Sequence, residues 1–111
     1  MTTTVTVHEG ATVLAVVGEV DLATAPALES AIDSTLSGKP GALVIDLSEV
    51  SFLASAGMAA LVAAHQRAGA TRIAVVADGP ATSRQLKMTN LDQVFALHAT
   101  LDQALSALNG N

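Results

Sequence analysis

The sequence predicts an α/β fold in which a mixed, mostly parallel sheet of roughly four to five strands is covered by about four helices. Short apolar runs rich in Val, Ile and Leu alternate with segments whose apolar residues recur at helical spacing. Such alternation gives parallel strands joined by right-handed crossovers. Because 111 residues suit one core, and Gly, Pro or Asp separates most segments, we expect a single domain over residues 1–111.

The first part of the chain is predicted to form a hairpin followed by a helix. Two strands rich in Val and Thr are expected over 4–7 and 12–17, with the first antiparallel to the second. The second strand is apolar at consecutive positions, which is typical of an interior strand covered on both faces. Thr24 is a capping residue type and Pro26 is tolerated in a first turn, so a helix is expected to begin there and to end at Gly38.

The remaining elements alternate in the same way. They are predicted as a buried strand over 42–46, a helix over 55–68, a buried strand over 72–77, a short helix over 81–88, an edge strand over 94–97 and a last helix from Thr100. Gln103 follows Thr100 by three residues, the reciprocal capping arrangement. The segment 47–54 is expected to be a loop that leads to Ser55, the cap of its helix.

The composition favours a protein that docks onto other proteins. Hydrophobic residues make up 50% of the chain and charged residues 14%, against about a quarter charged in an average soluble domain. The mean hydropathy is +0.50. These values argue against disorder and for an apolar surface, and large exposed apolar patches usually mark binding surfaces.

Charge and residue usage exclude several classes of partner. The chain has ten acidic and five basic residues and contains no Trp or Tyr, so nucleic-acid binding is not expected. The absence of cysteine excludes disulfides, thiolate catalysis and Cys-ligated zinc. No stretch reaches the roughly 18 apolar residues of a spanning helix, and the start, Met1–Thr4, lacks signal-peptide features. We therefore expect a cytoplasmic protein without direct membrane insertion.

Catalysis and metal binding have no support in the motifs. No Ser/His/Asp order, phosphate-binding Gly-rich loop or distinctive acid pair is present. His8, His65 and His98 fall in three separate elements without a second ligand at helical spacing, so surface or packing roles are favoured for them. We expect no enzymatic activity, no cofactor and no metal.

The segment around Ser55 is the most informative for function. At the start of a helix several backbone amides have no partner within the helix, and the positive end of the helix dipole lies there. A phosphate on Ser55 would add about −1.5 to −2 charges where they are best accepted. Gly57 is expected to leave the first turn bare, so that another chain can approach closely. The alternative is that Ser55 is an ordinary helix cap.

Asp21 and Asp46 each follow or close a predicted strand, which would place both near Ser55 on the rim where strands end. Open α/β sheets usually carry their sites there. A metal or nucleotide site is one interpretation, and turn-forming aspartates that bond their own backbone are the favoured one. Met58 is at core spacing, although it could also face a partner from the first turn.

The segment from Val44 to Met58 resembles the signature of the STAS domain family, found in anti-anti-sigma factors and at the end of sulphate transporters. In that family a strand ending Asp-Leu-Ser precedes an apolar-x-Phe pattern, Asp-Ser-Ser-Gly and a Leu- or Met-rich helix. The residues in register here are Asp46, Leu47, Ser48, Val50, Phe52, Ser55, Gly57 and Met58. The turn 18–21 is similar to the family's Gly-Glu-x-Asp turn, and the likeness in element order covers essentially the whole chain. Ala54 and Ala56 depart from the family's Asp and second Ser.

The resemblance implies a bacterial anti-sigma factor antagonist. In the family, the unphosphorylated antagonist binds an anti-sigma factor, typically a serine kinase of the histidine-kinase-like ATPase type, and frees a sigma factor. The kinase phosphorylates the serine that corresponds to Ser55, which abolishes binding, and a separate serine phosphatase restores it. On this basis the partner-binding residues are expected to be Asp21, Asp46, Ala54, Ser55, Ala56, Gly57 and Met58.

Two other interpretations fit the same family. One is a small STAS subunit that regulates a membrane transporter, such as the accessory protein of a lipid-transport ABC system. The other is a nucleotide-binding STAS protein. Recovery of an anti-sigma kinase from cell extract supports the leading interpretation, and recovery of a transporter permease or ATPase supports the first alternative.

Overall fold

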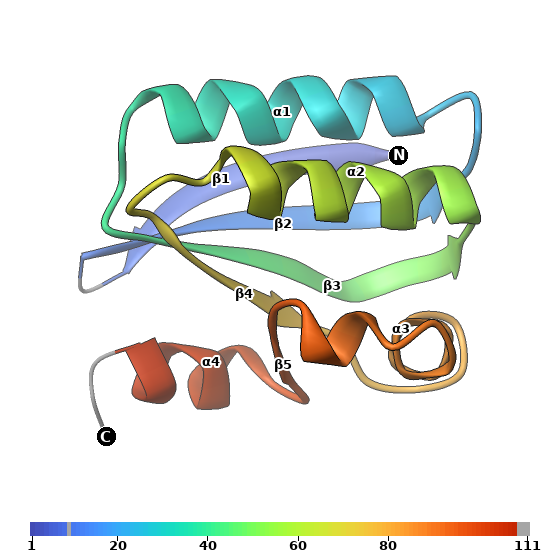
Figure 1. Cartoon of the computed structure of the whole chain (residues 1–111). Helices are drawn as coiled ribbons and strands as arrows, with labels where there is room; N and C mark the ends of the chain where they lie inside the picture. The colour runs from blue at the N-terminus through green and yellow to red at the C-terminus, as the bar shows by residue number, and fades with distance from the viewer. Residues whose placement is uncertain (9, 109–111) are drawn as a thin grey trace.

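The computed structural model describes residues 1–8 and 10–108 (Figure 1). Strands and helices alternate after an N-terminal hairpin. The elements are β1 (Thr2–His8), β2 (Ala11–Val20), α1 (Ala25–Ser37), β3 (Ala42–Leu53), α2 (Ser55–Arg67), β4 (Arg72–Val76), α3 (Ser83–Met88), the 3-10 helix η1 (Leu91–Gln93), β5 (Ala96–His98) and α4 (Leu101–Leu108). None of the helices in these ranges is long and apolar enough to cross a membrane.

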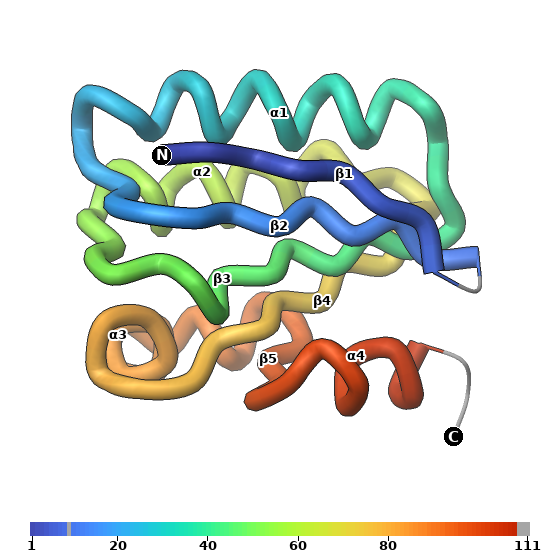
Figure 2. The backbone as a smooth tube through the Cα atoms, turned by 180° about the vertical axis from the view of Figure 1, so that it is seen from behind, coloured from blue at the N-terminus to red at the C-terminus, as the bar shows by residue number. Residues whose placement is uncertain are grey.

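The five strands form one sheet in the order β1-β2-β3-β4-β5. β1 pairs antiparallel with β2, and each later neighbour is parallel. The prediction of a mixed, mostly parallel sheet is therefore confirmed. Because every crossover moves on to the next strand, the order in the sheet follows the order in the chain, as the tube in Figure 2 shows.

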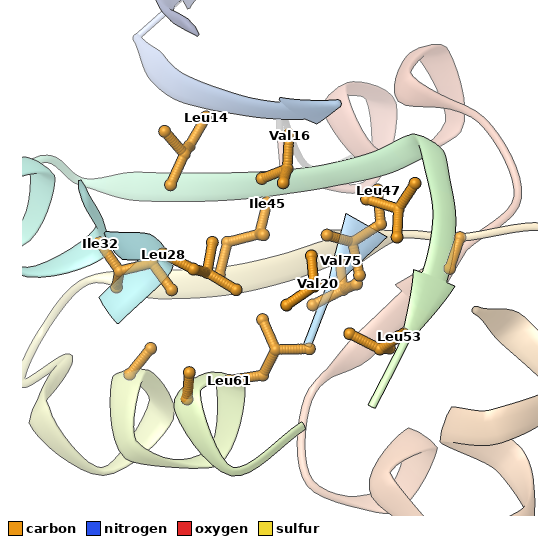
Figure 3. Packing of buried hydrophobic residues seen from close by; sticks show 14 of the residues in the cluster. Leu14, Val16, Val20, Leu28, Ile32, Ile45, Leu47, Leu53, Leu61 and Val75 are labelled. Carbon is orange, nitrogen blue, oxygen red and sulfur yellow. The ribbon is translucent and has the colours of Figure 1, made fainter. Parts of the chain in front are cut away.

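The core consists of two clusters, one on each face of the sheet, and one is much larger than the other. The larger cluster joins residues of the central strands to apolar residues of α1 and α2, among them Leu28, Ile32 and Leu61 (Figure 3). A smaller cluster on the other face joins Val44 and its neighbours to Ala104 of α4. The consecutive apolar residues of the central strands are explained by this double coverage.

β3 is longer than the sequence predicts. The segment 47–53, expected as a loop, continues the strand and pairs with the end of β2 through two register shifts. Its buried residues, Leu47, Val50 and Leu53, are spaced three apart, and an exposed pair precedes both Val50 and Leu53. This period of three hides the alternation by which a strand is normally predicted. Ala54 alone separates the strand from α2.

The observed starts of the helices lie closer to the positions predicted from the sequence. Thr24 stands at the N-cap of α1, with Pro26 in the first turn. Before α4, the Gln103 amide donates to Thr100 Oγ1 at 3.1 Å, and the Ala99 amide donates to Gln103 Oε1 at 3.2 Å. The start of α4 is therefore set by the capping bonds predicted from the sequence. Thr24 occupies the predicted position, but its side chain makes no capping bond to α1 and bonds to the Asp21 turn instead.

Candidate docking and modification site

Ser55 is the first residue of α2 and is exposed. Figure 1 shows that α2 begins at the end of the sheet where β2 and β3 finish. The Ala54 amide donates to the Val20 carbonyl at 2.8 Å, which joins the ends of the two strands to the start of α2. Ala54 is the N-cap residue, with extended backbone (φ −84°, ψ 169°). The expectation that Ser55 caps the helix is wrong, because β3 runs on until Ala54 makes the turn and Ser55 is already helical.

The first turn of α2 keeps unpartnered donors at its surface. The amides of Gly57 and Met58 donate to the Ala54 carbonyl, at 3.0 and 3.1 Å. Among the described residues, no backbone carbonyl accepts from the amides of Ser55 and Ala56. The turn also contains no acidic side chain, so the positive end of the dipole of this 13-residue helix is not neutralised locally. Such an end accepts a phosphate readily.

Gly57 is buried beneath this surface. A Cβ atom at its position would lie 2.6 Å from Val20 Cγ1 and 2.8 Å from Leu53 Cδ1. The glycine therefore lets α2 approach the ends of β2 and β3 closely. The side chains of Val20 and Leu53 are labelled in Figure 3. The sequence predicted that Gly57 leaves the backbone accessible to a partner. The structure shows instead that Gly57 is buried and permits close packing.

Asp21 orders the turn between β2 and α1. Its Oδ1 accepts from the Thr24 amide at 2.9 Å and from Thr24 Oγ1 at 3.1 Å, while its own amide donates to Thr24 Oγ1 at 2.9 Å. The bond from the Thr24 backbone is the main reason why the pKa of Asp21 lies below its ordinary value of 3.8. These bonds agree with a turn-forming aspartate.

Asp46 is not at the rim beside Ser55. It lies within β3, where it pairs with Ala15 and Val76, and its Oδ1 accepts from the Ser48 amide at 3.0 Å. Alternation along the strand puts it on the face of Val44, which packs in the α4 cluster. The expected position beside Ser55 is wrong because β3 does not end at Asp46.

Large exposed apolar residues gather at the Ser55 end, and the sequence did not single out two of them. Leu22, in the turn after β2, is 80% exposed, Phe52 is 49% exposed and Met88, the last residue of α3, is 70% exposed. Thr89 Oγ1 donates to Met58 Sδ at 3.7 Å, so the end of α3 lies against α2. Met58 is half-buried on the core. Ala54, Ser55, Ala56 and Met58 lie at the start of α2, and the bond from the Ala54 amide to the Val20 carbonyl places the Asp21 turn beside them.

The fold and this exposed serine, set among apolar side chains at a strand–helix junction, define a small α/β domain with a candidate docking surface. Residues 2–104 match the family described as the STAS domain. The chain belongs to the STAS domain family.

Similar proteins agree with this assignment over nearly the whole chain. The anti-sigma-F factor antagonist RsfB of Mycobacterium tuberculosis is 44% identical over 111 residues, which cover 99% of this chain and 91% of RsfB. The crystal structure of an anti-sigma factor antagonist from Mycobacterium paratuberculosis is 50% identical with a TM-score of 0.94, covering 97% of this chain and 93% of that one.

The anti-sigma factor antagonist SpoIIAA shares the fold at lower identity. Its unphosphorylated form is 17% identical with a TM-score of 0.72, over 99% of this chain and all of SpoIIAA. The phosphorylated form of the Bacillus protein is 16% identical with a TM-score of 0.67, over 96% of this chain and 99% of that one. This likeness bears on the fold alone.

Proposed function

We propose that this chain is an anti-sigma factor antagonist, whose unphosphorylated form binds an anti-sigma factor and frees a sigma factor. RsfB, which is named an anti-sigma-F factor antagonist, is similar along nearly its full length. The observation that carries the proposal is an exposed Ser55, outside the capping position, on an uncharged first turn flanked by exposed apolar side chains. The antagonist names of the relatives favour this role over a transporter subunit.

Phosphorylation of Ser55 would switch the docking off. The free amides of Ser55 and Ala56 tolerate a phosphate in the unbound protein. When a partner closes over this surface, the added charge has to be desolvated. A loss of about 3 kcal/mol weakens binding more than a hundredfold.

The switch would need an enzyme for each direction. We assign the phosphorylation to the anti-sigma factor itself, as a serine kinase with a histidine-kinase-like ATPase fold, and the reversal to a serine phosphatase. Ala54 and Ala56 put no carboxylate beside the phosphoserine, so no like charge in the first turn opposes it. The chain would act in the cytoplasm by binding, and it would need no catalytic residue of its own.

The test uses the purified anti-sigma-F factor of Mycobacterium tuberculosis as the binding probe. The parent and the Ser55→Ala variant are expected to bind it, and Ser55→Glu is expected to weaken binding at least about tenfold through the buried charge. Ser106→Glu is the matched control, because Ser106 is an exposed serine on α4. Failure of the parent to bind, or equal binding by Ser55→Glu, contradicts the proposal.

The modification is mapped separately. Incubation with the same anti-sigma factor and ATP, followed by mass spectrometry, is expected to place one phosphate on Ser55. Ser48 and Ser51 are the exposed serines of β3 that precede it. Phosphate that persists in the Ser55→Ala variant would contradict the assignment of the site.

A further inference from the structure

The two edges of the sheet differ in how well they are protected from another strand. At one edge, β5 has only three residues, and such a short strand offers little backbone to another chain. At the other edge, β1 has seven residues, and all of them pair with β2 in one uninterrupted antiparallel register. Because strand backbone groups point alternately to the two sides, β1 keeps a row of amides and carbonyls on its outer side, where no strand of the described residues pairs with it.

β1 carries none of the sequence features that usually protect an edge strand. Its sequence, Thr-Thr-Thr-Val-Thr-Val-His, contains no acidic residue, lysine, arginine, proline or glycine. Its register with β2 has no bulge. Charges, prolines and bulges are the means by which natural proteins keep edge strands from pairing. Threonine and valine, in contrast, favour strands, so this edge is suited to accept a further strand.

Apolar surface continues from the larger core cluster onto β1. Val5 pairs with Leu14 and Val7 with Thr12, so both valines lie on the face of the sheet that carries Leu14, a member of that cluster. On this face α1 packs against β2, and Val5 and Val7 stay 55% and 72% exposed. Figure 2 shows β1 beyond β2, on the side away from β3. A strand added outside β1 would therefore cover apolar side chains as well as backbone groups.

The sequence of β1 indicates that the added strand is β1 of a second copy of this chain. Two copies related by a two-fold axis at Val5, perpendicular to the sheet, pair antiparallel over the whole strand. The residues opposite each other are then Val5 and Val5, Thr4 and Thr6, Thr3 and Val7, and Thr2 and His8. No pair brings like charges together, although each chain has a net charge of −5, and β-branched cross-strand pairs stabilise a sheet.

We propose that the chain forms a two-fold symmetric dimer through β1, in which the two sheets join into one continuous sheet. The same strand of each copy then serves as partner of the other. A single strand pair about 24 Å long is at the small end of specific interfaces, so the association is expected to be weak. Because the copies run antiparallel, their Ser55 ends lie at opposite ends of the joined sheet, and the proposal does not depend on the proposed function.

The mass of the chain as a function of concentration tests the dimer. In sedimentation equilibrium from about 10 μM to about 1 mM, a range that covers weak association, the average mass of the parent should rise from 11.1 kDa towards twice that value. Val5→Lys places two like charges opposite each other at the axis, so it should raise the dissociation constant of the dimer at least about tenfold. Circular dichroism checks that each variant is folded.

Val17→Lys is the matched control, because it makes the same change of side chain and charge on the neighbouring strand. Val17 lies on β2 and is 43% exposed, but its backbone pairs with β1 and β3. The dissociation constant should therefore change less than about twofold. A parent that stays at 11.1 kDa over the whole range, or an equal loss with Val17→Lys, contradicts the dimer and leaves the edge to a strand of another protein.

Two variants of opposite charge test the register. In homodimers, Val5→Lys and Val5→Glu each bring like charges together, whereas in an equimolar mixture of the two variants opposite charges face each other at the axis. The mixture should therefore recover association to within about threefold of the parent, and high salt should reduce this recovery. A mixture that associates as weakly as each variant alone contradicts the two-fold pairing at Val5.

Discussion

The two ends of the sheet differ in how their polar groups are bonded. At the end opposite Ser55 they bond to one another, whereas at the Ser55 end the amides of Ser55 and Ala56 have no backbone partner among the described residues. Thr71 Oγ1 donates to the Pro40 carbonyl at 2.7 Å, and the Arg72 amide donates to the Gly41 carbonyl at 3.1 Å. A hollow of about 390 Å³ lies there too. Arg67, which lines it, pairs with Asp33 at 2.6 Å.

The Ser55 end has a hollow of similar size but a different surface. Leu22, Phe52 and Met88 are exposed there, and the nearby charges of Glu19 and Lys87 are outside the ion pairs of the described residues. A hollow alone therefore does not distinguish the two ends. Exposed apolar side chains alone do not distinguish them either, since Val7 near the opposite end is exposed too. The Ser55 end is marked by exposed apolar side chains together with the unpartnered amides of Ser55 and Ala56.

The largest expected effect tests how tightly the docking end is packed. Gly57→Val should lower the free energy of unfolding by about 2–3 kcal/mol, because the new side chain overlaps Val20 and Leu53. Ala59→Val is the matched control, since it adds the same side chain at an exposed position of the same helix and should cost no more than about 0.7 kcal/mol. Urea unfolding measures both, and equal effects would contradict the close approach at Gly57.

Removing the exposed apolar side chains should weaken docking without loss of stability. Leu22→Ala and Phe52→Ala are each expected to weaken binding of the Mycobacterium tuberculosis anti-sigma-F factor about tenfold, or about 1.4 kcal/mol. Val7→Ala on β1 is the control, because Val7 is 72% exposed but belongs to the hairpin. Isothermal titration calorimetry measures the dissociation constant of each variant. If Val7→Ala matters as much as Phe52→Ala, the docking surface is misplaced.

At the opposite end, breaking the ion pairs should have a small effect on stability and none on binding. Arg67→Ala removes contacts to Asp33 and Glu29, whose side chains are about half exposed, so the loss of stability should stay below about 1 kcal/mol. Urea unfolding at low and high salt measures it. A binding defect in this variant would argue against the contrast between the two ends.

The smallest effect concerns the pH dependence of the Asp21 turn. The pKa of Asp21 is lowered by the hydrogen bond from the Thr24 backbone, so the unfolded chain takes up this proton first as the pH falls. The stabilisation is complete above the ordinary pKa of 3.8 and is lost as the pH falls through the lower folded value. Acid unfolding should therefore be shallower for Asp21→Asn than for the parent, and parallel curves would contradict this role.

The sequence predicted the parts of the site that depend on local residues. Thr24 and Pro26 at a helix start, and an exposed Ser55 at the next one, follow from residue type and spacing. Asp46 was misplaced because the period of three after it conceals the second half of β3. Leu22 and Met88 were missed because the exposure of an apolar residue depends on which neighbours the tertiary fold supplies, and local spacing does not contain that information.

The most direct test of the central claim compares two chemically homogeneous forms of the chain, one with a serine and one with a phosphoserine at position 55. Their dissociation constants for the Mycobacterium tuberculosis anti-sigma-F factor are measured side by side. The phosphoserine form should bind more than about a hundredfold more weakly at unchanged stability. Equal dissociation constants would contradict the claim that charge on Ser55 controls docking.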